Sequence, residues 1–108
     1  MSIQSFTNIV FIGETRKVAY IEYSDEVLTV AAPEYQVFLA ADLPPETPPD
    51  LLAANEQTVS GGKEIYAMWD TSSVTVPGKY MVYLQYELNG EKRIREFLFT
   101  LVEKGILR

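Results

Sequence analysis

Carboxylates are the commonest side chains in this sequence that could do chemistry, either as an acid and base pair or as ligands for a metal ion. Fifteen Asp and Glu stand against nine Lys and Arg, which gives a formal net charge of −6. The densest acidic group is Asp42, Glu46 and Asp50, but prolines separate its members, and no D-x-[DN]-x-[DN]-G calcium loop is present. We interpret these three residues as solvated loop charges, and we predict no bound metal and no cofactor.

The side chains that most enzymes use near neutral pH are missing. There is no His and no Cys, which removes the usual general base, the thiol nucleophile and the common zinc ligands. Ser60-Gly61-Gly62-Lys63 brings a hydroxyl and an amine together, but it lacks the spacing of a phosphate-binding loop. Gly-Gly between two alternating runs is instead typical of a hairpin turn. We therefore expect a protein that is not an enzyme.

Charge and hydropathy also narrow the class of partner. A net charge of −6 leaves no broad basic face for phosphate groups, so we expect no nucleic-acid binding. The longest apolar runs, residues 9–12 and 37–41, fall well below the roughly 18 residues of a membrane span, so we expect no membrane insertion. The first residues lack the basic and apolar segments of a signal peptide. Together with the absence of Cys, this is typical of a cytoplasmic protein.

Aromatic and proline-rich segments offer two further kinds of binding site. Six tyrosines and the single Trp could stack on sugar rings: Tyr20, Tyr23, Tyr35, Tyr66, Tyr83, Tyr86 and Trp69. Tyr is also a strong strand former that spans core and solvent, so we favour a distributed structural role and keep carbohydrate binding as the alternative. The long loop at 42–55 contains Pro45-x-x-Pro48, but its acidic flanks favour a stiff connection between sheets over a peptide ligand.

Strands must position all of these groups. Val, Ile, Tyr, Phe and Thr recur in runs separated by Gly, Pro, Asn and Asp, and no run has helical periodicity over three turns. The length of 108 residues and the 47% hydrophobic content predict a single domain, residues 1–108, with one core. We expect seven or eight strands, at about 3–12, 16–23, 27–30, 34–41, 57–60, 63–69, 79–88 and 91–102.

Asn89-Gly90 predicts the register of the last two strands. This pair favours a two-residue type I′ turn, which places Tyr80 opposite Phe99 on the core face. The outward face then carries four large apolar side chains, which are Met81, Tyr83, Ile94 and Leu98. Such a patch commonly marks a contact between proteins, so we expect these four residues to bind a protein partner or a second copy.

The same register predicts an irregularity near the open end of the hairpin. It places Arg93 and Arg95 on the core side of the last strand. Either their guanidinium groups reach out past the edge of the sandwich, or a bulge near Arg95 shifts the strand. The sequence leaves both alternatives open.

The segment Val76-Pro77-Gly78-Lys79-Tyr80 resembles the tyrosine corner of immunoglobulin-like sandwiches, in which the Tyr hydroxyl bonds the backbone of the preceding loop. Val82 then stands where antibody domains carry their second Cys, and we expect Ala19 or Ile21 to face it. The lone Trp69 is on the sixth predicted strand and not on the third, so the resemblance is to the architecture at large. It implies an all-β, immunoglobulin-like antiparallel β-sandwich with seven to eight strands.

The order of motifs from Thr15 to Val102 is similar to small immunoglobulin-like proteins and domains of tailed bacteriophages and prophages. The motifs are V-x-Y-I-x-Y-x-D, I-Y-A-M-W-D-T-S-S-V-T-V-P-G-K-Y, the Asn-Gly hairpin and F-L-F-T-L-V. The resemblance implies a non-catalytic structural or accessory component of the particle, attached to capsid or tail, and so a cytoplasmic or virion-associated location. The alternative is a carbohydrate-binding or cell-surface adhesion module, which requires tyrosines gathered on one exposed face.

Overall fold

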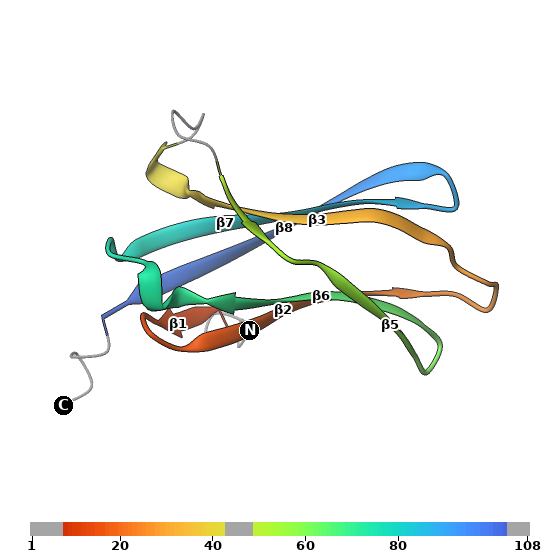
Figure 1. Ribbon diagram of the computed structural model, residues 1–108, viewed down its shortest axis with the longest axis horizontal. Helices are drawn as coiled ribbons and strands as arrows, with labels where there is room; N and C mark the ends of the chain where they lie inside the picture. Colours follow the sequence, from red (N-terminus) through yellow and green to blue (C-terminus); the bar gives the residue numbers. More distant parts are fainter. Residues whose placement is uncertain (1–7, 43–48, 104–108) are drawn as a thin grey trace, which may run out of the picture.

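The computed structural model describes residues 8–42 and 49–103, which form two sheets packed face to face (Figure 1). The five-stranded sheet has the order β1 (Ile9–Phe11), β8 (Glu91–Val102), β7 (Gly78–Leu88), β3 (Val30–Leu39) and β4 (Asp50–Leu52). The three-stranded sheet has the order β2 (Thr15–Tyr23), β6 (Gly62–Asp70) and β5 (Asn55–Val59). Two 3-10 turns, η1 (Ala40–Asp42) and η2 (Thr71–Ser73), complete the elements. The predicted all-β, immunoglobulin-like sandwich is confirmed.

The pairing is antiparallel at every junction of the described strands except one. β1 runs parallel to β8, with Ile9 beside Thr100 and Phe11 beside Val102. The two strands of this pair come from opposite ends of the described chain, and β1 lies beside only the last three residues of β8. β2, which follows β1 directly, crosses to the other sheet and pairs with β6.

One predicted strand is not separate in the structure, and one strand was missed. The strand predicted at 27–30 is not separate, because β3 begins at Val30 and continues to Leu39 past an irregularity between Ala31 and Glu34, where Ala32 has a φ of 50°. β4 lies within the loop predicted at 42–55 and pairs with β3. Its three residues are too few to give an alternating pattern. Of the strand predicted at 3–12, residues 3–7 lie outside the described residues, as does Pro45-x-x-Pro48.

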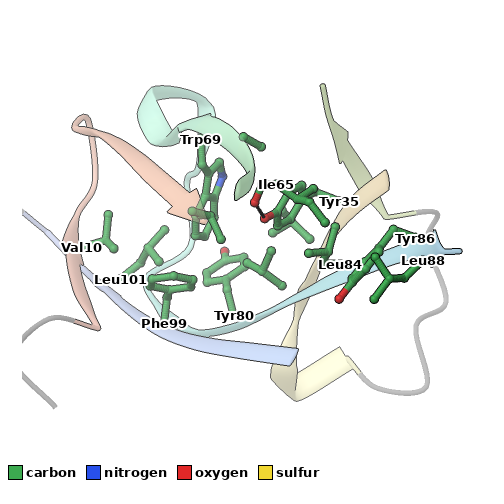
Figure 2. Packing of buried hydrophobic residues seen from close by; sticks show 14 residues of the cluster. Val10, Tyr35, Ile65, Trp69, Tyr80, Leu84, Tyr86, Leu88, Phe99 and Leu101 are labelled. Atoms are coloured by element: carbon green, nitrogen blue, oxygen red, sulfur yellow. Dashed lines mark hydrogen bonds between the residues drawn. The ribbon is translucent and has the colours of Figure 1, made fainter. Parts of the chain in front are cut away.

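The core lies between the two sheets and is rich in aromatic rings (Figure 2). Trp69 packs edge to face against Tyr80 and Phe99, with ring centroids 6.1 and 5.8 Å apart. Such pairs stabilise beyond the area that they bury. The buried hydrophobic residues are Val10, Val18, Tyr35, Val37, Ile65, Ala67, Trp69, Tyr80, Val82, Leu84, Tyr86, Leu88, Phe99 and Leu101.

The interior face of β2 is the opposite of the one predicted. Val18 is buried in the core cluster and Tyr20 packs against that cluster, whereas Ala19 and Ile21 alternate with them on the outward side. The expectation that Ala19 or Ile21 would face Val82 is therefore wrong. Residues 18–21 are all apolar or aromatic, so alternation alone could not select the buried face.

The hairpin of β7 and β8 has the predicted register. Pairing is continuous from Gly78 and Leu101 to Leu88 and Glu91, with Tyr80 opposite Phe99, and it contains no bulge. The bulge proposed near Arg95 is therefore excluded. The tyrosine corner is also confirmed, since the Tyr80 hydroxyl donates a hydrogen bond of 2.6 Å to the carbonyl oxygen of Val76.

Candidate functional site

The outward face of the five-stranded sheet carries a row of large apolar side chains across three strands. Phe38 on β3 pairs with Met81 on β7, and Met81 pairs with Leu98 on β8. Tyr83 lies in the next row, and its ring packs edge to face on that of Phe38 with centroids 5.5 Å apart. Leu98 is 43% exposed, while Met81 and Tyr83 are half-buried. These residues, with Ile94, are called the apolar face below.

Ile94 lies somewhat apart from the other predicted members. It is 54% exposed and pairs with Gln85, two rows away from the row that contains Leu98. Glu96, which is opposite Tyr83, separates Ile94 from Leu98 along β8. Ile94 therefore reaches the rest of the apolar face only through its diagonal neighbour Tyr83. The structure brings Met81, Tyr83 and Leu98 together and leaves Ile94 at the margin.

The sequence did not identify Phe38 as part of this face. The alternation of β3 could have shown that Phe38 points away from the core, because Tyr35 and Val37 are buried. The sequence carries no local signal that β3 pairs with β7, since the two strands are joined by a long segment. Leu51 on β4 was also missed: it pairs with Gln36, is 62% exposed and extends the outward surface beyond β3.

Charged side chains of both signs surround the apolar row. Lys79 lies near the start of β7, two residues before Met81, and Glu87 lies near its end. Glu34 on β3 and Lys92 on β8 lie near the same end as Glu87. An apolar centre with a charged rim is the usual composition of a protein interface.

A polar cluster lies between the two sheets, around the inward-pointing side chain of Arg95. The Tyr86 hydroxyl donates a hydrogen bond to Oε2 of Glu22, and Nη2 of Arg95 is 3.4 Å from the same oxygen. The Arg95 guanidinium also lies 4.8 Å from the ring centroid of Tyr20. Burial raises the pKa of Tyr86, and the contact with Glu22 raises it further. These groups join β2 to β7 and β8, so the cluster has a structural role.

One nearly buried carboxylate lies on the outward side of the three-stranded sheet. Glu64 is 8% exposed, and Oε1 accepts hydrogen bonds from Gln57 Nε2 and, at 3.1 Å, from Lys17 Nζ. The hydrogen bond from Gln57 holds the pKa of Glu64 below its usual value, and Lys17 adds to this effect. Lys17 also lies 4.9 Å above the ring of Tyr66. Each polar group here has a partner, which indicates a stabilising network.

The remaining predicted candidates do not gather into a site in the described chain. Glu46 lies outside the described residues, and within 8–42 and 49–103 no three acidic side chains are placed to hold a metal ion. The predicted hairpin turn between β5 and β6 is present, but it consists of Ser60 and Gly61 and not of Gly61 and Gly62, with Val59 opposite Gly62 and a Gly61 φ of 83°. Lys63 Nζ is 3.0 Å from Oε1 of Glu56. No helix in these same ranges is long and apolar enough to cross a membrane.

A hollow of about 290 Å³ lies beside the β5–β6 turn. It is lined by Ser24, Glu26, Val27, Leu28, Thr58, Val59, Gly61, Gly62 and Lys63. The only cation in this lining is Lys63, whose ammonium group is paired with Glu56. The lining therefore presents no unpaired cation to an anionic ligand.

The seven tyrosines are spread over the whole sandwich. Three of them, Tyr35, Tyr80 and Tyr86, are buried in the core. Tyr20 packs against the core, Tyr66 lies under Lys17 on one outward face, and Tyr83 lies on the other. Tyr23 is the most exposed of them at 71%.

Comparison with protein-family models, with curated proteins and with solved structures finds no match for this chain. Its function must therefore be inferred from its own residues.

Proposed function

We propose that this protein is a non-catalytic structural or binding module of a phage or prophage particle, and that its apolar face docks on another protein of the particle. The observation that carries the proposal is the row of Phe38, Met81 and Leu98 across three adjacent strands. An antiparallel sheet with a solvated outer side carries polar residues at such positions. Three large apolar side chains in line, with Tyr83 beside them, favour an outer side that is covered by another protein.

The partner that fits this face is a protein with an apolar centre and polar groups of both signs around it. Lys79 and Glu96 frame the row on opposite sides, so a partner of one charge would meet repulsion at one of them. Met81 and Tyr83 are half-buried within their own sheet and so lose little side-chain freedom when a partner covers them. We expect these central residues to contribute most of the binding energy.

The lack of catalytic groups supports a non-catalytic role. The chain has no His and no Cys. Two shielded carboxylates, Glu22 and Glu64, are each held by a cation and a second hydrogen-bond donor. A carboxylate fixed in this way has little freedom to act as an acid or base.

The positions of the tyrosines favour the docking module over the alternative of a carbohydrate-binding or adhesion module. Sugar binding would need several rings on one exposed face. Tyr35, Tyr80 and Tyr86 are in the core, and Tyr66 and Tyr83 lie on opposite sides of the sandwich. Among the ring contacts of the described residues, only Phe38–Tyr83 lies on an outward face, and it contains a single tyrosine.

The test uses two methionines on opposite faces. Met81 lies in the apolar row, whereas Met68 is 52% exposed on the outward side of the three-stranded sheet. We expect Met81→Lys to reduce incorporation of the tagged protein into particles from the producing strain by about tenfold or more, and Met68→Lys to leave it unchanged. Leu98→Lys, at a more exposed position of the same row, should reproduce the loss without a folding defect.

Circular dichroism of both variants verifies that the fold is intact. Equal incorporation of the Met81→Lys and Met68→Lys proteins would refute docking through this face. Absence of the wild-type protein from purified particles would refute the role in a particle. Genes for capsid, portal or tail proteins beside this one would support that role.

A further inference from the structure

The edge of the five-stranded sheet next to β8 is only partly covered. β8 pairs with β7 from Glu91 to Leu101, but on its other side β1 pairs only with Thr100 to Val102. Among residues 8–42 and 49–103, no strand lies beside the remaining part of β8. An uncovered strand edge presents N–H and C=O groups that can pair with another strand.

The hydrogen bonds to β1 show which residues face this edge. The N–H of Thr100 donates to the carbonyl oxygen of Asn8 at 2.8 Å, and the carbonyl oxygen of Val102 accepts from the N–H of Ile12 at 2.9 Å. Even-numbered residues therefore direct their backbone groups to the edge, because these directions alternate along an antiparallel strand. The even-numbered residues of the uncovered part are Lys92, Ile94, Glu96 and Leu98, and all four side chains are exposed.

The order of these side chains allows two copies of β8 to pair with each other. Lys92 and Glu96 have opposite charges and lie two positions before and after Ile94. When two copies of β8 align antiparallel with Ile94 opposite Ile94, Lys92 of each copy lies opposite Glu96 of the other. Opposite charges at directly paired positions stabilise a sheet. A shift of the register by one pair of residues would place Ile94 opposite Glu96 and would remove both ion pairs.

We propose that two copies of this chain associate through their β8 edges, with Ile94 at the centre and two Lys92–Glu96 ion pairs around it. The two five-stranded sheets then become one continuous sheet, and the apolar faces of both copies lie on the same side of it. This dimer does not depend on the proposed docking function, because it forms along the β8 edge and leaves Phe38, Met81 and Tyr83 on β3 and β7 uncovered.

Two contacts must be accommodated in the dimer. Nη1 of Arg95 donates a 3.2 Å hydrogen bond to the carbonyl oxygen of Ile94, and the N–H group of the partner strand would replace it. On the inner side, Arg93 of one copy approaches Arg95 of the other. Each already has a carboxylate beside it, with Glu91 3.0 Å from Arg93 and Glu22 3.4 Å from Arg95.

Charged residues on an edge strand often serve only to prevent pairing. A protective edge would work with charges of one sign, which repel a second copy in every register. Here the two signs are placed symmetrically around an exposed isoleucine, so one register is attractive. This symmetry distinguishes a self-pairing edge from a blocked one.

The experiment measures the mass of the full chain by sedimentation from about 1 µM to about 1 mM protein. We expect the wild type to form a dimer within this range. Lys92→Glu and Glu96→Lys should each raise the dissociation constant about tenfold, because two attractive pairs become repulsive. The double variant K92E/E96K should restore it. An equimolar mixture of the two single variants should form a mixed dimer, since each ion pair is then complete.

Lys79→Glu is the matched control, since Lys79 is an exposed lysine of the same sheet on the inner strand β7. It should leave the dissociation constant unchanged, as should Met81→Lys. A wild-type chain that stays monomeric at every concentration would overturn the proposal. Failure of the mixture to form a mixed dimer would overturn it too. Met81→Lys should reduce incorporation into particles and leave the dimer intact, so the two proposals fail separately.

Discussion

The hydroxyl of Tyr35 on β3 donates a 2.6 Å hydrogen bond to the carbonyl oxygen of Ile65 on β6, and this bond joins the two sheets inside the core (Figure 2). Tyr35 is fully buried, and its burial raises the pKa of the hydroxyl, so the group stays protonated and remains a donor. In antibody domains a disulfide connects the sheets at the centre of the core. This chain has no Cys, and the buried tyrosine supplies a polar connection between the sheets instead.

Tyr35→Phe should lower the free energy of unfolding by about 1–3 kcal/mol, because the buried carbonyl oxygen of Ile65 loses this donor. Urea denaturation monitored by Trp69 fluorescence measures the change. Tyr23→Phe is the matched control, since Tyr23 is 71% exposed, and it should change the free energy by less than about 0.5 kcal/mol. Equal effects of the two substitutions would show that the hydrogen bond between the sheets contributes nothing.

Tyr80→Phe tests the tyrosine corner in the same assay. The hydroxyl bonds the carbonyl oxygen of Val76, four residues earlier, and fixes the loop that leads into β7. We expect a loss of about 1–3 kcal/mol. Compared with the wild type, the variant should show a larger increase in amide hydrogen exchange in the loop at 74–77 than in β8. A free energy of unfolding equal to that of the wild type would mean that the corner is not a stabilising feature of this domain.

The hydrogen bond and the ion pair that Glu64 makes predict that the folded domain loses stability in acid. Its pKa is lower in the folded chain than in the unfolded chain, chiefly through Gln57 and then through Lys17. The resulting stabilisation is complete above the unfolded pKa, near pH 4.3, and is lost as the pH falls through the lower, folded pKa. Glu64→Gln should therefore reduce the difference in stability between pH 7 and pH 3. Glu87→Gln, at an exposed position of β7, should keep most of that difference.

Ile94→Lys tests whether Ile94 is a surface residue. Its side chain is 54% exposed, so the lysine should cost the isolated domain less than about 1 kcal/mol in thermal or chemical unfolding. Ile65→Lys, at a fully buried position, should prevent folding. The Ile94 variant should also weaken self-association, because Ile94 is at the centre of the proposed β8 pairing. A variant that does not fold would place Ile94 in the core and contradict the register.

Local signals made part of this fold predictable. Asn89-Gly90 fixed the β7–β8 register through the geometry of a two-residue turn, and the position of Tyr80 after Pro77-Gly78 predicted its hydrogen bond to the loop. Both features depend on residues close together in the chain. Four of the five residues of the apolar face follow from that one hairpin.

Features that depend on distant pairing were not predictable. Phe38 joins the apolar face only because β3 lies beside β7, and no local pattern specifies that neighbour. The buried face of β2 was assigned wrongly because Val18 and Ala19 are both apolar, and the pairing with β6 decides between them. β4 has only three residues, so its pairing with β3 and not its composition makes it a strand.

The parallel pairing of β1 with β8 determines how the domain would bear a mechanical load. In a parallel pair, a pull on the chain before Ile9 and a pull after Val102 act in opposite directions along the two strands. The bonds between Asn8 and Thr100 and between Ile12 and Val102 would then be loaded together, in shear, and could not open one at a time. Forced unfolding is governed by the unfolding rate, and this geometry slows it under tension without adding equilibrium stability. A domain tethered at both ends would therefore resist stretching at this short strand first.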